Sequence, residues 1–245
     1  MNRTVYTLVS KRALTRDVFE LTLSGDTSAV VRPGQFVDLA VAGLFLRRPI
    51  SVCDWGPGRL TLILRAVGAG TRALADAEPG ACFDALSGLG NGYDAEKARG
   101  VAPILIGGGV GVPPLYGLAR RMAEAGAAPA VALGFNTARD VFYADEFRAL
   151  GCEVLLSTVD GSAGERGFVT DLVKKTGCDY AFCCGPEPML KAVYALPQLA
   201  GGQFSFEERM GCGFGACMGC SCRTKYGAKR ICRDGPVLEK EEIVW

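Results

Sequence analysis

The stretch ILIGGGVGVPP, residues 104–114, decides the fold of the middle of the chain. It joins a short apolar run to a glycine-rich turn and then to a helical segment that closes at Gly126. A strand that reaches a helix N-terminus through glycines can bind a dinucleotide pyrophosphate, because free N–H groups and the helix dipole both favour an anion. The candidate contact residues are Gly109, Gly111 and Pro114. They spell G-x-G-x-x-P in place of the usual G-x-G-x-x-G, so an ordinary tight turn is the alternative interpretation.

Apolar, strand-like runs alternate with helical stretches from residue 103 to residue 198. The runs lie at residues 103–106, 130–135, 154–158 and 180–184, and the helical stretches close on Gly126, Gly151 and Gly177 or before Pro197. Strict alternation of strand and helix predicts a doubly wound parallel sheet in an α/β domain. The second run ends in GFN, residues 134–136, where an acidic residue usually binds the ribose. The turn therefore leaves both NAD and NADP open as the nucleotide.

A second candidate site follows the last predicted parallel strand, where the chain reads CGPEPM, residues 184–189. Ligands bind at the carboxyl ends of the strands in open α/β sheets. A Gly-Pro turn at that edge would bring the Cys184 thiol towards the bound nucleotide, so Cys184 is a candidate catalytic residue. The alternative is a buried cysteine in front of a helix that begins with proline.

Residues 1–98 have a different pattern, in which apolar residues recur at every second position. The clearest runs are residues 19–23, 37–41 and 60–64, and turn signals separate them at 33–34, 56–58 and 79–80. This spacing predicts a small antiparallel β barrel. One short helix, residues 71–77, is expected to interrupt the barrel, with Thr71 as its N-cap.

Two stretches of the predicted barrel have residues that could hold a dinucleotide flavin. They are RPIS, residues 48–51, at the start of a strand, and GAGT, residues 68–71, at the start of the short helix. Arg48 can neutralise a pyrophosphate through two parallel hydrogen bonds, and the helix N-terminus at Thr71 offers a second anion site. Ser51 can donate a hydrogen bond to a ring nitrogen, which makes it a candidate catalytic residue. The alternatives are a solvated arginine pair and an ordinary helix cap.

Five of the eleven cysteines lie between residues 212 and 232. Four of them, Cys212, Cys217, Cys220 and Cys232, have the spacing C-x4-C-x2-C-x11-C, which is typical of a plant-type [2Fe-2S] cluster. Glycines between and beside them would let the backbone bend closely around inorganic sulfides. A four-thiolate zinc site and buried, unligated thiols are the alternatives. We interpret Cys222 as a spare thiol beside the cluster.

The composition excludes several kinds of chemistry. The 245 residues include no histidine, which rules out Ser-His-Asp and Cys-His hydrolases, His-ligated zinc or haem, and a Rieske centre. A net charge of +1 without a basic patch argues against nucleic acid and a membrane surface as partners. We find no secretory signal and no run long enough to span a bilayer, so a disulfide scaffold is unexpected and a cytoplasmic location is expected.

The order of these motifs along nearly the whole chain resembles the ferredoxin reductase-like family. The similarity is greatest to a branch of electron-transfer subunits, and the stretch EERMGCG, residues 207–213, supports that branch. Ile50 stands where the wider family has tyrosine in R-x-Y-S, so stacking of a tyrosine ring is lost. The resemblance implies FAD, a [2Fe-2S] cluster and NAD(H) as substrate.

The resemblance also assigns residues to each group. It implies FAD contacts from Arg48, Pro49, Ile50, Ser51, Ile63, Leu64, Arg65, Gly70 and Thr71. It places NAD(H) over Gly109, Gly111 and Cys184, and the cluster on Cys212, Cys217, Cys220 and Cys232.

We expect three domains: an FAD-binding β barrel at 1–98, an NAD-binding α/β domain at 99–201 and a [2Fe-2S] domain at 202–245. A nicotinamide transfers two electrons as hydride, a cluster transfers one, and a flavin does both. The resemblance implies a heterotetramer with an FMN-containing subunit that oxidises dihydroorotate, and electron flow to NAD+ in pyrimidine (UMP) synthesis. The same module in a sulfhydrogenase, a sulfide dehydrogenase or a bifurcating transhydrogenase is the alternative. A zinc-stabilised nucleotide-binding regulator is a more distant one.

Overall fold

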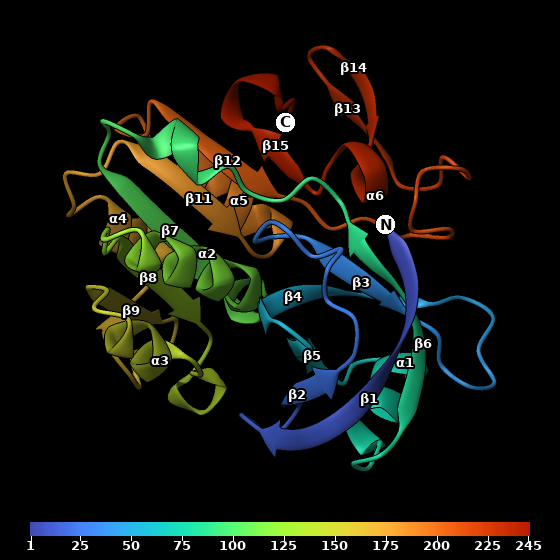
Figure 1. Ribbon diagram of the computed structural model, residues 1–245. Coiled ribbons are helices and arrows are strands. Elements are labelled where there is room, and N and C mark those ends of the chain that lie inside the picture. The colour runs from blue at the N-terminus through green and yellow to red at the C-terminus, as the bar shows by residue number, and fades with distance from the viewer.

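The computed structural model describes all residues from Met1 to Trp245. Its N-terminal part is a closed antiparallel barrel with the strand order β1-β2-β5-β4-β3-β6 (Figure 1). The strands are β1 (Asn2–Ala13), β2 (Val18–Ser24), β3 (Phe36–Leu39), β4 (Arg48–Gly56), β5 (Arg59–Arg65) and β6 (Cys82–Leu89), and one helix, α1 (Ala69–Asp76), follows β5. Leu21, Leu23, Leu60 and Leu62 are fully buried in the barrel core. The predicted barrel is thereby confirmed.

The middle of the chain forms a seven-stranded sheet with the order β10-β9-β8-β7-β11-β12-β15. Its strands are β7 (Pro103–Gly108), β8 (Ala130–Phe135), β9 (Val154–Thr158), β10 (Glu165–Arg166), β11 (Tyr180–Cys184), β12 (Gly201–Ser205) and β15 (Val237–Glu239). All neighbouring strands are parallel except β12 and β15, which are antiparallel. The predicted parallel sheet is confirmed, and its first strand extends to Gly108.

Helices cover both faces of this sheet. They are α2 (Val112–Glu124), α3 (Ala144–Ala149), α4 (Val169–Val173) and α5 (Glu187–Tyr194). Leu105 packs in one core with residues of α2 and α3, whereas Ile104 and Ile106 pack in another core with residues of α4 and α5. Side chains of successive strand residues point to opposite faces, which explains this division. Short 3-10 helices occupy connections at Ala95–Ala98, Gly109–Gly111, Ala138–Asp140 and Lys240–Glu242.

The C-terminal region contains a two-stranded sheet of β13 (Ser221–Thr224) and β14 (Gly227–Arg230), followed by α6 (Ile231–Asp234). These elements lie together at one end of the molecule, above the barrel in Figure 1. The chain leaves the parallel sheet at β12 and returns to it at β15, where Phe204 is paired with Leu238. The cysteine-rich segment is therefore held by the nucleotide sheet at both of its ends.

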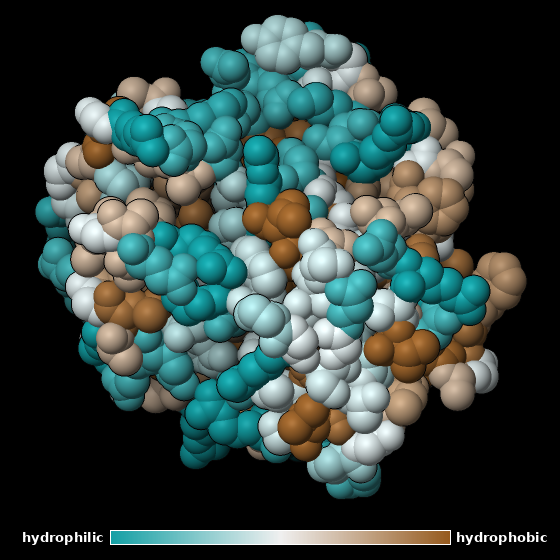
Figure 2. All heavy atoms as spheres, in the orientation of Figure 1, coloured by the Kyte–Doolittle hydropathy of each residue, from teal (hydrophilic) through white to brown (hydrophobic).

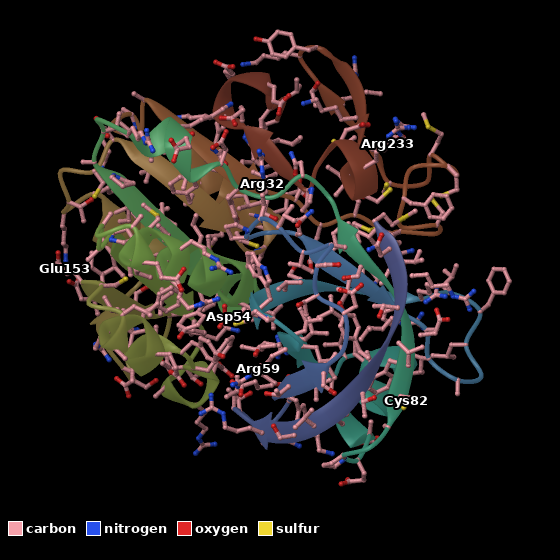
Figure 3. All side chains as sticks on the ribbon, viewed as in Figure 1. Arg32, Asp54, Arg59, Cys82, Glu153 and Arg233 are labelled. Atoms are coloured by element: carbon pink, nitrogen blue, oxygen red, sulfur yellow. The ribbon has the colours of Figure 1, made fainter.

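The barrel and the parallel sheet meet where α2 packs against β4. A Cβ atom on Gly117 would lie 2.7 Å from the backbone oxygen of Cys53, so only glycine permits this approach. The Arg120 guanidinium donates to the Asp54 carboxylate over 2.6 Å and to the backbone oxygen of Trp55 over 2.7 Å. Figure 3 shows Asp54 at this junction. These contacts fix the two predicted cofactor-binding parts relative to each other.

One local expectation is corrected by the structure. Thr71 is not the N-cap of α1, because the helix begins at Ala69 and Gly68 is the cap residue. Thr71 Oγ1 instead accepts a hydrogen bond from the Gly68 N–H at 3.1 Å, from the third position of the helix. Near the C-terminus, Glu242 is buried and forms an ion pair with Lys229.

No helix is long and apolar enough to cross a membrane. On the face drawn in Figure 2, hydrophobic side chains form small separate groups among hydrophilic ones.

Candidate functional site

The four predicted iron ligands lie between β12 and β15, and the structure associates them in two pairs. The N–H groups of Ala216 and Cys217 donate to Cys212 Sγ over 3.2 and 3.4 Å. The N–H of Cys232, on α6, donates to Cys220 Sγ over 3.4 Å. Cys217 is exposed, whereas Cys220 and Cys232 are buried. No three histidine, cysteine, aspartate or glutamate side chains are gathered closely enough to hold one metal ion.

The environments of the thiols differ in their effect on ionisation. Burial opposes ionisation of Cys212, but the backbone N–H groups of Cys217, Phe214 and Ala216 outweigh it and lower the pKa of this thiol to about 6. Burial and the neighbouring Cys220 raise the pKa of Cys232. Because a metal is bound by the thiolate, Cys212 is prepared for ligation by its own loop.

Glycines shape the loop around the thiols. Cβ atoms on Gly211 and Gly219 would lie 3.3 and 3.5 Å from Cys217 Sγ, so the backbone passes close to that sulfur. Gly213 and Gly215 have φ values of +76° and +95°, which disfavour residues with a Cβ atom. Thiols, N–H donors aimed at sulfur and a close backbone are what an iron–sulfur cluster needs, so the residues present fit such a group.

The cysteine-rich region also contacts the barrel directly. Asn91, just after β6, donates from Nδ2 to the Val237 backbone oxygen over 2.7 Å and accepts at Oδ1 from the Val237 N–H over 3.1 Å. Gly90 lies against Pro236, where a Cβ atom would be 2.6 Å from Pro236 Cδ. The segment that follows Cys232 is thus tied to the strand end next to β3.

The predicted flavin residues Arg48 and Gly70 are brought together by the fold. The Arg48 side chain lies so close to Gly70 in α1 that a Cβ atom there would overlap the guanidinium. Arg48 donates to the carbonyl oxygens of Leu46 and Arg47 and forms no ion pair, whereas Arg47 is paired with Asp84. The charge of Arg48 is therefore available at the N-terminal end of α1, where helix dipole and cation together favour an anion.

The other predicted flavin residues are on the neighbouring strands. Pro49, Ile50 and Ser51 are on β4, and Ile63, Leu64 and Arg65 are on β5. Ile50, Ile63 and Leu64 are buried, and Ser51 is half-buried and paired in register with Phe36 of β3. Arg65 is exposed, and its Nε donates to the Asp17 carboxylate over 2.5 Å.

The predicted nucleotide residues also converge. Gly109 has a φ of +51°, and Gly111 packs so tightly against the Cys184 carbonyl that a Cβ atom would overlap it. Pro114 is buried in the first turn of α2. The glycine-rich turn after β7 and the end of β11 therefore form one edge of the parallel sheet, as the topology rule for such sites requires.

Cys184 is a buried, neutral thiol at this edge. Burial, helped by the Glu207 carboxylate, raises its pKa to about 12, although the hydroxyl groups of Ser205 and Tyr93 act in the opposite direction. Ser205 stands opposite Cys184 in the register of β11 and β12. The thiol can therefore make contacts as S–H but does not supply a thiolate at neutral pH.

Two protein families match segments of the chain. The family described as "Iron-sulfur cluster binding domain of dihydroorotate dehydrogenase B" matches residues 207–244, and "Oxidoreductase NAD-binding domain" matches residues 105–195. The electron transfer subunit of dihydroorotate dehydrogenase B (NAD(+)) from Shouchella clausii is 44% identical, over 97% of this chain and 96% of that protein. The subunit of the same name from a Geobacillus species is 41% identical, over 100% and 99%.

The chain belongs to the family of electron transfer subunits of dihydroorotate dehydrogenase B. A solved structure of an NADH-dependent reduced ferredoxin-NADP oxidoreductase, described in connection with flavin-based electron bifurcation, is also similar, with a TM-score of 0.86 and 29% identity. That similarity covers 98% of this chain and 90% of the other. The iron–sulfur match at 207–244 contains all four predicted ligand cysteines, and the NAD-binding match at 105–195 contains Gly109, Gly111 and Cys184.

Sequence patterns missed two residues of this electron transfer subunit that lie beside its predicted sites. Tyr93 contacts the end of β11, and its Oη donates to the Cys183 backbone oxygen over 3.0 Å. Asp38 is only 2% exposed on β3, and burial raises the pKa of its carboxyl to about 6, with Arg47 and Arg48 acting in the opposite direction. A polar residue inside FVDL, a strand that is buried throughout, was the available signal for Asp38.

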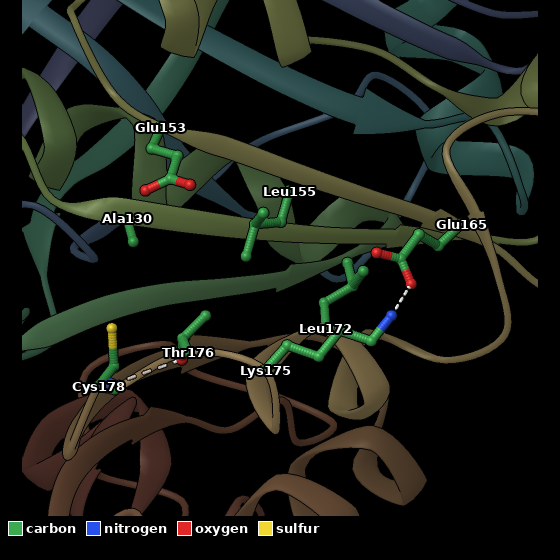
Figure 4. A pocket seen from close by; sticks show the side chains of 9 residues that line it. Ala130, Glu153, Leu155, Glu165, Leu172, Lys175, Thr176 and Cys178 are labelled. Carbon is green, nitrogen blue, oxygen red and sulfur yellow. Dashed lines mark hydrogen bonds and ion pairs between the residues drawn. The ribbon is translucent and has the colours of Figure 1, made fainter.

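Figure 4 shows a separate hollow in the subunit, and none of the predicted site residues lines it. Its lining includes Ala130 and Glu153, at the starts of β8 and β9, and an ion pair between Lys175 and Glu165. Ligands of open sheets bind at the carboxyl ends of strands, so this hollow at the amino ends of β8 and β9 is not the nucleotide site.

Proposed function

We propose that this chain passes electrons between a dihydroorotate-oxidising FMN subunit and NAD+ through a [2Fe-2S] cluster and FAD, as a step of pyrimidine (UMP) biosynthesis. The observation that carries the proposal is the contact of the segment directly after Cys232 with the end of the barrel that bears Arg48 and Ser51, through Val237 and Asn91. When bound, FAD exchanges hydride with NAD(H) and single electrons with the cluster. Nearness of the two binding regions is what such exchange requires.

Four cysteines are proposed to hold the cluster: Cys212, Cys217, Cys220 and Cys232. The N–H groups around Cys212 stabilise negative charge on that sulfur, and the glycines leave room for inorganic sulfide. Cys222 lies on β13, half-buried, and is proposed to remain unligated. The [2Fe-2S] type is supported by the C-x4-C-x2-C-x11-C spacing.

The barrel residues are proposed to bind FAD. Arg48 would neutralise the pyrophosphate next to the Gly70–Thr71 turn of α1, since it has no competing carboxylate. Ser51 would donate a hydrogen bond to the flavin ring, and Ile50, Ile63 and Leu64 would contribute further contacts from the same pair of strands. Pro49 and Arg65 would line the same pair of strands, β4 and β5.

NAD(H) is proposed to lie over the edge formed by the glycine-rich turn and the end of β11. Gly109 leaves open space for the pyrophosphate beside the backbone, Gly111 lets the turn pack against the end of β11, and Pro114 fixes the first turn of α2. Cys184 would position the nicotinamide as a neutral thiol. NAD in preference to NADP is supported by the names of the relatives at 41–44% identity, which specify NAD(+).

The partner is proposed to be the FMN-containing catalytic subunit, in a heterotetramer of two copies of each chain. A cytoplasmic location is proposed because none of the eleven cysteines forms a disulfide. The chain is proposed to have three domains, at 1–98, 99–201 and 202–245. Strand β12 spans the second boundary, since it pairs with β11 of the nucleotide sheet along Gly201–Ser205.

A second candidate function is a subunit of an electron-bifurcating complex. The similarity to an NADH-dependent reduced ferredoxin-NADP oxidoreductase, with a TM-score of 0.86, favours it. Sequence identity is higher to the dihydroorotate dehydrogenase subunits, at 44% against 29%, so the first function is preferred.

Anaerobic purification of the chain with its natural partner tests the proposal. We expect FAD, iron and inorganic sulfide in the complex, the visible spectrum of flavin and [2Fe-2S], and NAD+-dependent formation of orotate from dihydroorotate. Copurification with a hydrogenase or with a large flavoprotein that reduces ferredoxin would support an alternative complex. A colourless complex that contains zinc and no iron would reject electron transfer altogether.

A further inference from the structure

Asp38 is buried at the contact between the barrel and the iron–sulfur loop. It is on β3, where it stands opposite Pro49 of the RPIS stretch in the register of β3 and β4. On its other side, the carboxylate lies against Gly213, the residue after Cys212, where a Cβ atom would be 2.5 Å from Asp38 Oδ2 and 3.3 Å from Cγ. One side chain thus lies between a predicted flavin strand and a predicted cluster loop.

The carboxylate has no other evident structural task. Its Oδ1 atom is buried without a hydrogen-bond partner, and the side chain forms no ion pair. Arg47, directly before RPIS, donates to the backbone oxygen of Asp38 from one nitrogen and to the Asp84 carboxylate from the other. An unpartnered buried acceptor costs free energy, so its presence here calls for a local role.

The glycine on the opposite side is suited to this contact. Gly213 has a φ of +76° and no room for a Cβ atom, so the loop can approach Asp38 only with glycine at this position. Gly215, two residues later, has a φ of +95° but lies against the flexible Arg233 side chain, which Figure 3 shows in the C-terminal region. Of these two glycines, only Gly213 therefore contacts the barrel.

We infer that Asp38 is a positioning residue that seats the iron–sulfur loop on the flavin barrel at Gly213. The inference rests on the proposed function, because it gives the loop a cluster to hold. By filling the space between β3 and the loop, Asp38 fixes the place of Cys212 relative to the strand that begins with Arg48. If the carboxylate is removed, the loop should open more often and release iron faster.

The test measures how fast a ferrous chelator removes iron from the cluster of the purified two-subunit complex. The readout is the loss of the cluster's visible absorption with time. We expect Asp38→Ala to accelerate the loss about tenfold and to leave FAD content unchanged. A tenfold change corresponds to a decrease of about 1.4 kcal/mol in the free energy of local opening. Asp38→Asn keeps the shape and an acceptor oxygen and should restore most of the wild-type rate. Asp84→Ala is the matched control, because it removes the carboxylate that pairs with Arg47 without touching Gly213, and it should leave the rate unchanged.

A double-mutant cycle separates the contact from general loosening of the loop. Gly213→Ala and Gly215→Ala both place a Cβ atom at a positive φ, but only the first places a methyl group against Asp38. Combined with Asp38→Ala, the Gly213→Ala effect should be less than additive, whereas the Gly215→Ala effect should be additive. The cycle is read from iron per FAD if Asp38→Ala retains too little cluster for kinetics.

The results distinguish this inference from the function on which it rests. An unchanged rate in Asp38→Ala, an equal acceleration in Asp84→Ala, or additivity with Gly213→Ala would overturn the role of Asp38 alone. A wild-type complex without iron would instead overturn the proposed function.

Discussion

The hydroxyl of Tyr93 donates a hydrogen bond to the backbone oxygen of Cys183 over 3.0 Å, and both groups are buried. Tyr93 follows β6 of the barrel, and its N–H donates to the Pro33 carbonyl over 2.7 Å. Cys183 is on β11, directly before Cys184. A single residue therefore joins the barrel to the strand end at which the nicotinamide is proposed to lie.

Tyr93→Phe should lower the free energy of unfolding by about 1 kcal/mol, the usual contribution of one hydrogen bond between uncharged groups. The ring would still pack edge-on against Phe182, so the loss is limited to the hydroxyl. The midpoint of urea unfolding measures the change. Tyr226→Phe is the control, because that residue is 75% exposed and should have no effect. Equal midpoints for the wild type and Tyr93→Phe would contradict the prediction.

Gly117→Ala should destabilise the junction of α2 and β4 by about 1–3 kcal/mol, the range found for overpacked sites. The added methyl group would lie 2.7 Å from the Cys53 backbone oxygen, which cannot move without disturbing the barrel. Thermal unfolding monitored by circular dichroism measures the loss. Gly56→Ala, in the same strand β4, has open space around it and is the matched control. A melting temperature as high as that of the control would contradict the prediction, because it would mean that the junction accommodates the methyl group.

Arg48→Ala should weaken FAD binding about 10- to 100-fold, since a hydrogen bond to a charged group contributes roughly 1.5–3 kcal/mol. The cluster content should stay unchanged, because the cysteines do not depend on this side chain. Titration of the flavin-free chain with FAD, followed by flavin fluorescence, measures the change. Arg47→Ala is the control, since Arg47 is already paired with Asp84. Equal weakening by the two substitutions would remove Arg48 from the pyrophosphate site.

Cys232→Ser should abolish the visible absorption of the cluster, whereas Cys222→Ser should preserve it. Burial raises the pKa of Cys232, and the neighbouring Cys220 and Cys212 raise it further, which groups this residue with the other predicted ligands. Burial raises the pKa of Cys222, on β13, and the charge of Glu208 acts in the same direction, so a thiolate is disfavoured there. Iron and sulfide analysis of the two variants checks the assignment. The reverse result would make Cys222 the fourth ligand.

Regular periodicity made much of the fold predictable from the sequence. The runs at Ala130–Phe135, Val154–Thr158 and Tyr180–Cys184 have the bounds expected for parallel strands, because glycine or proline stands close to each helical boundary. The meeting of Gly111 with Cys184 also followed from pattern, since carboxyl ends of parallel strands share one edge of the sheet.

Exact helix boundaries and contacts between distant segments were not predictable in the same way. The sequence predicts Thr71 as a helix cap, but Gly68 takes that position because helix α1 starts two residues before Thr71. The return of β15 to β12 depends on pairing across more than thirty residues, for which the short run at Val237–Glu239 has no periodic signal. Asp38 and Gly213 meet only through tertiary structure, so their contact could not be found from spacing.

Cys184→Ala should slow hydride transfer between NADH and the flavin by about one to two orders of magnitude, as expected for loss of a positioning contact, and should leave FAD content unchanged. Because burial raises the pKa of Cys184 to about 12, its thiol keeps the proton throughout the neutral range. The ratio of wild-type to variant rate should therefore stay constant across the neutral range. Stopped-flow measurement of flavin reduction at several pH values tests both statements.

Cys183→Ala is the control, because Cys183 packs in the core on the opposite face of the sheet and should not alter the rate. A ratio that grows with rising pH would mean that a thiolate takes part, and an unaltered rate in Cys184→Ala would remove this residue from the nicotinamide site.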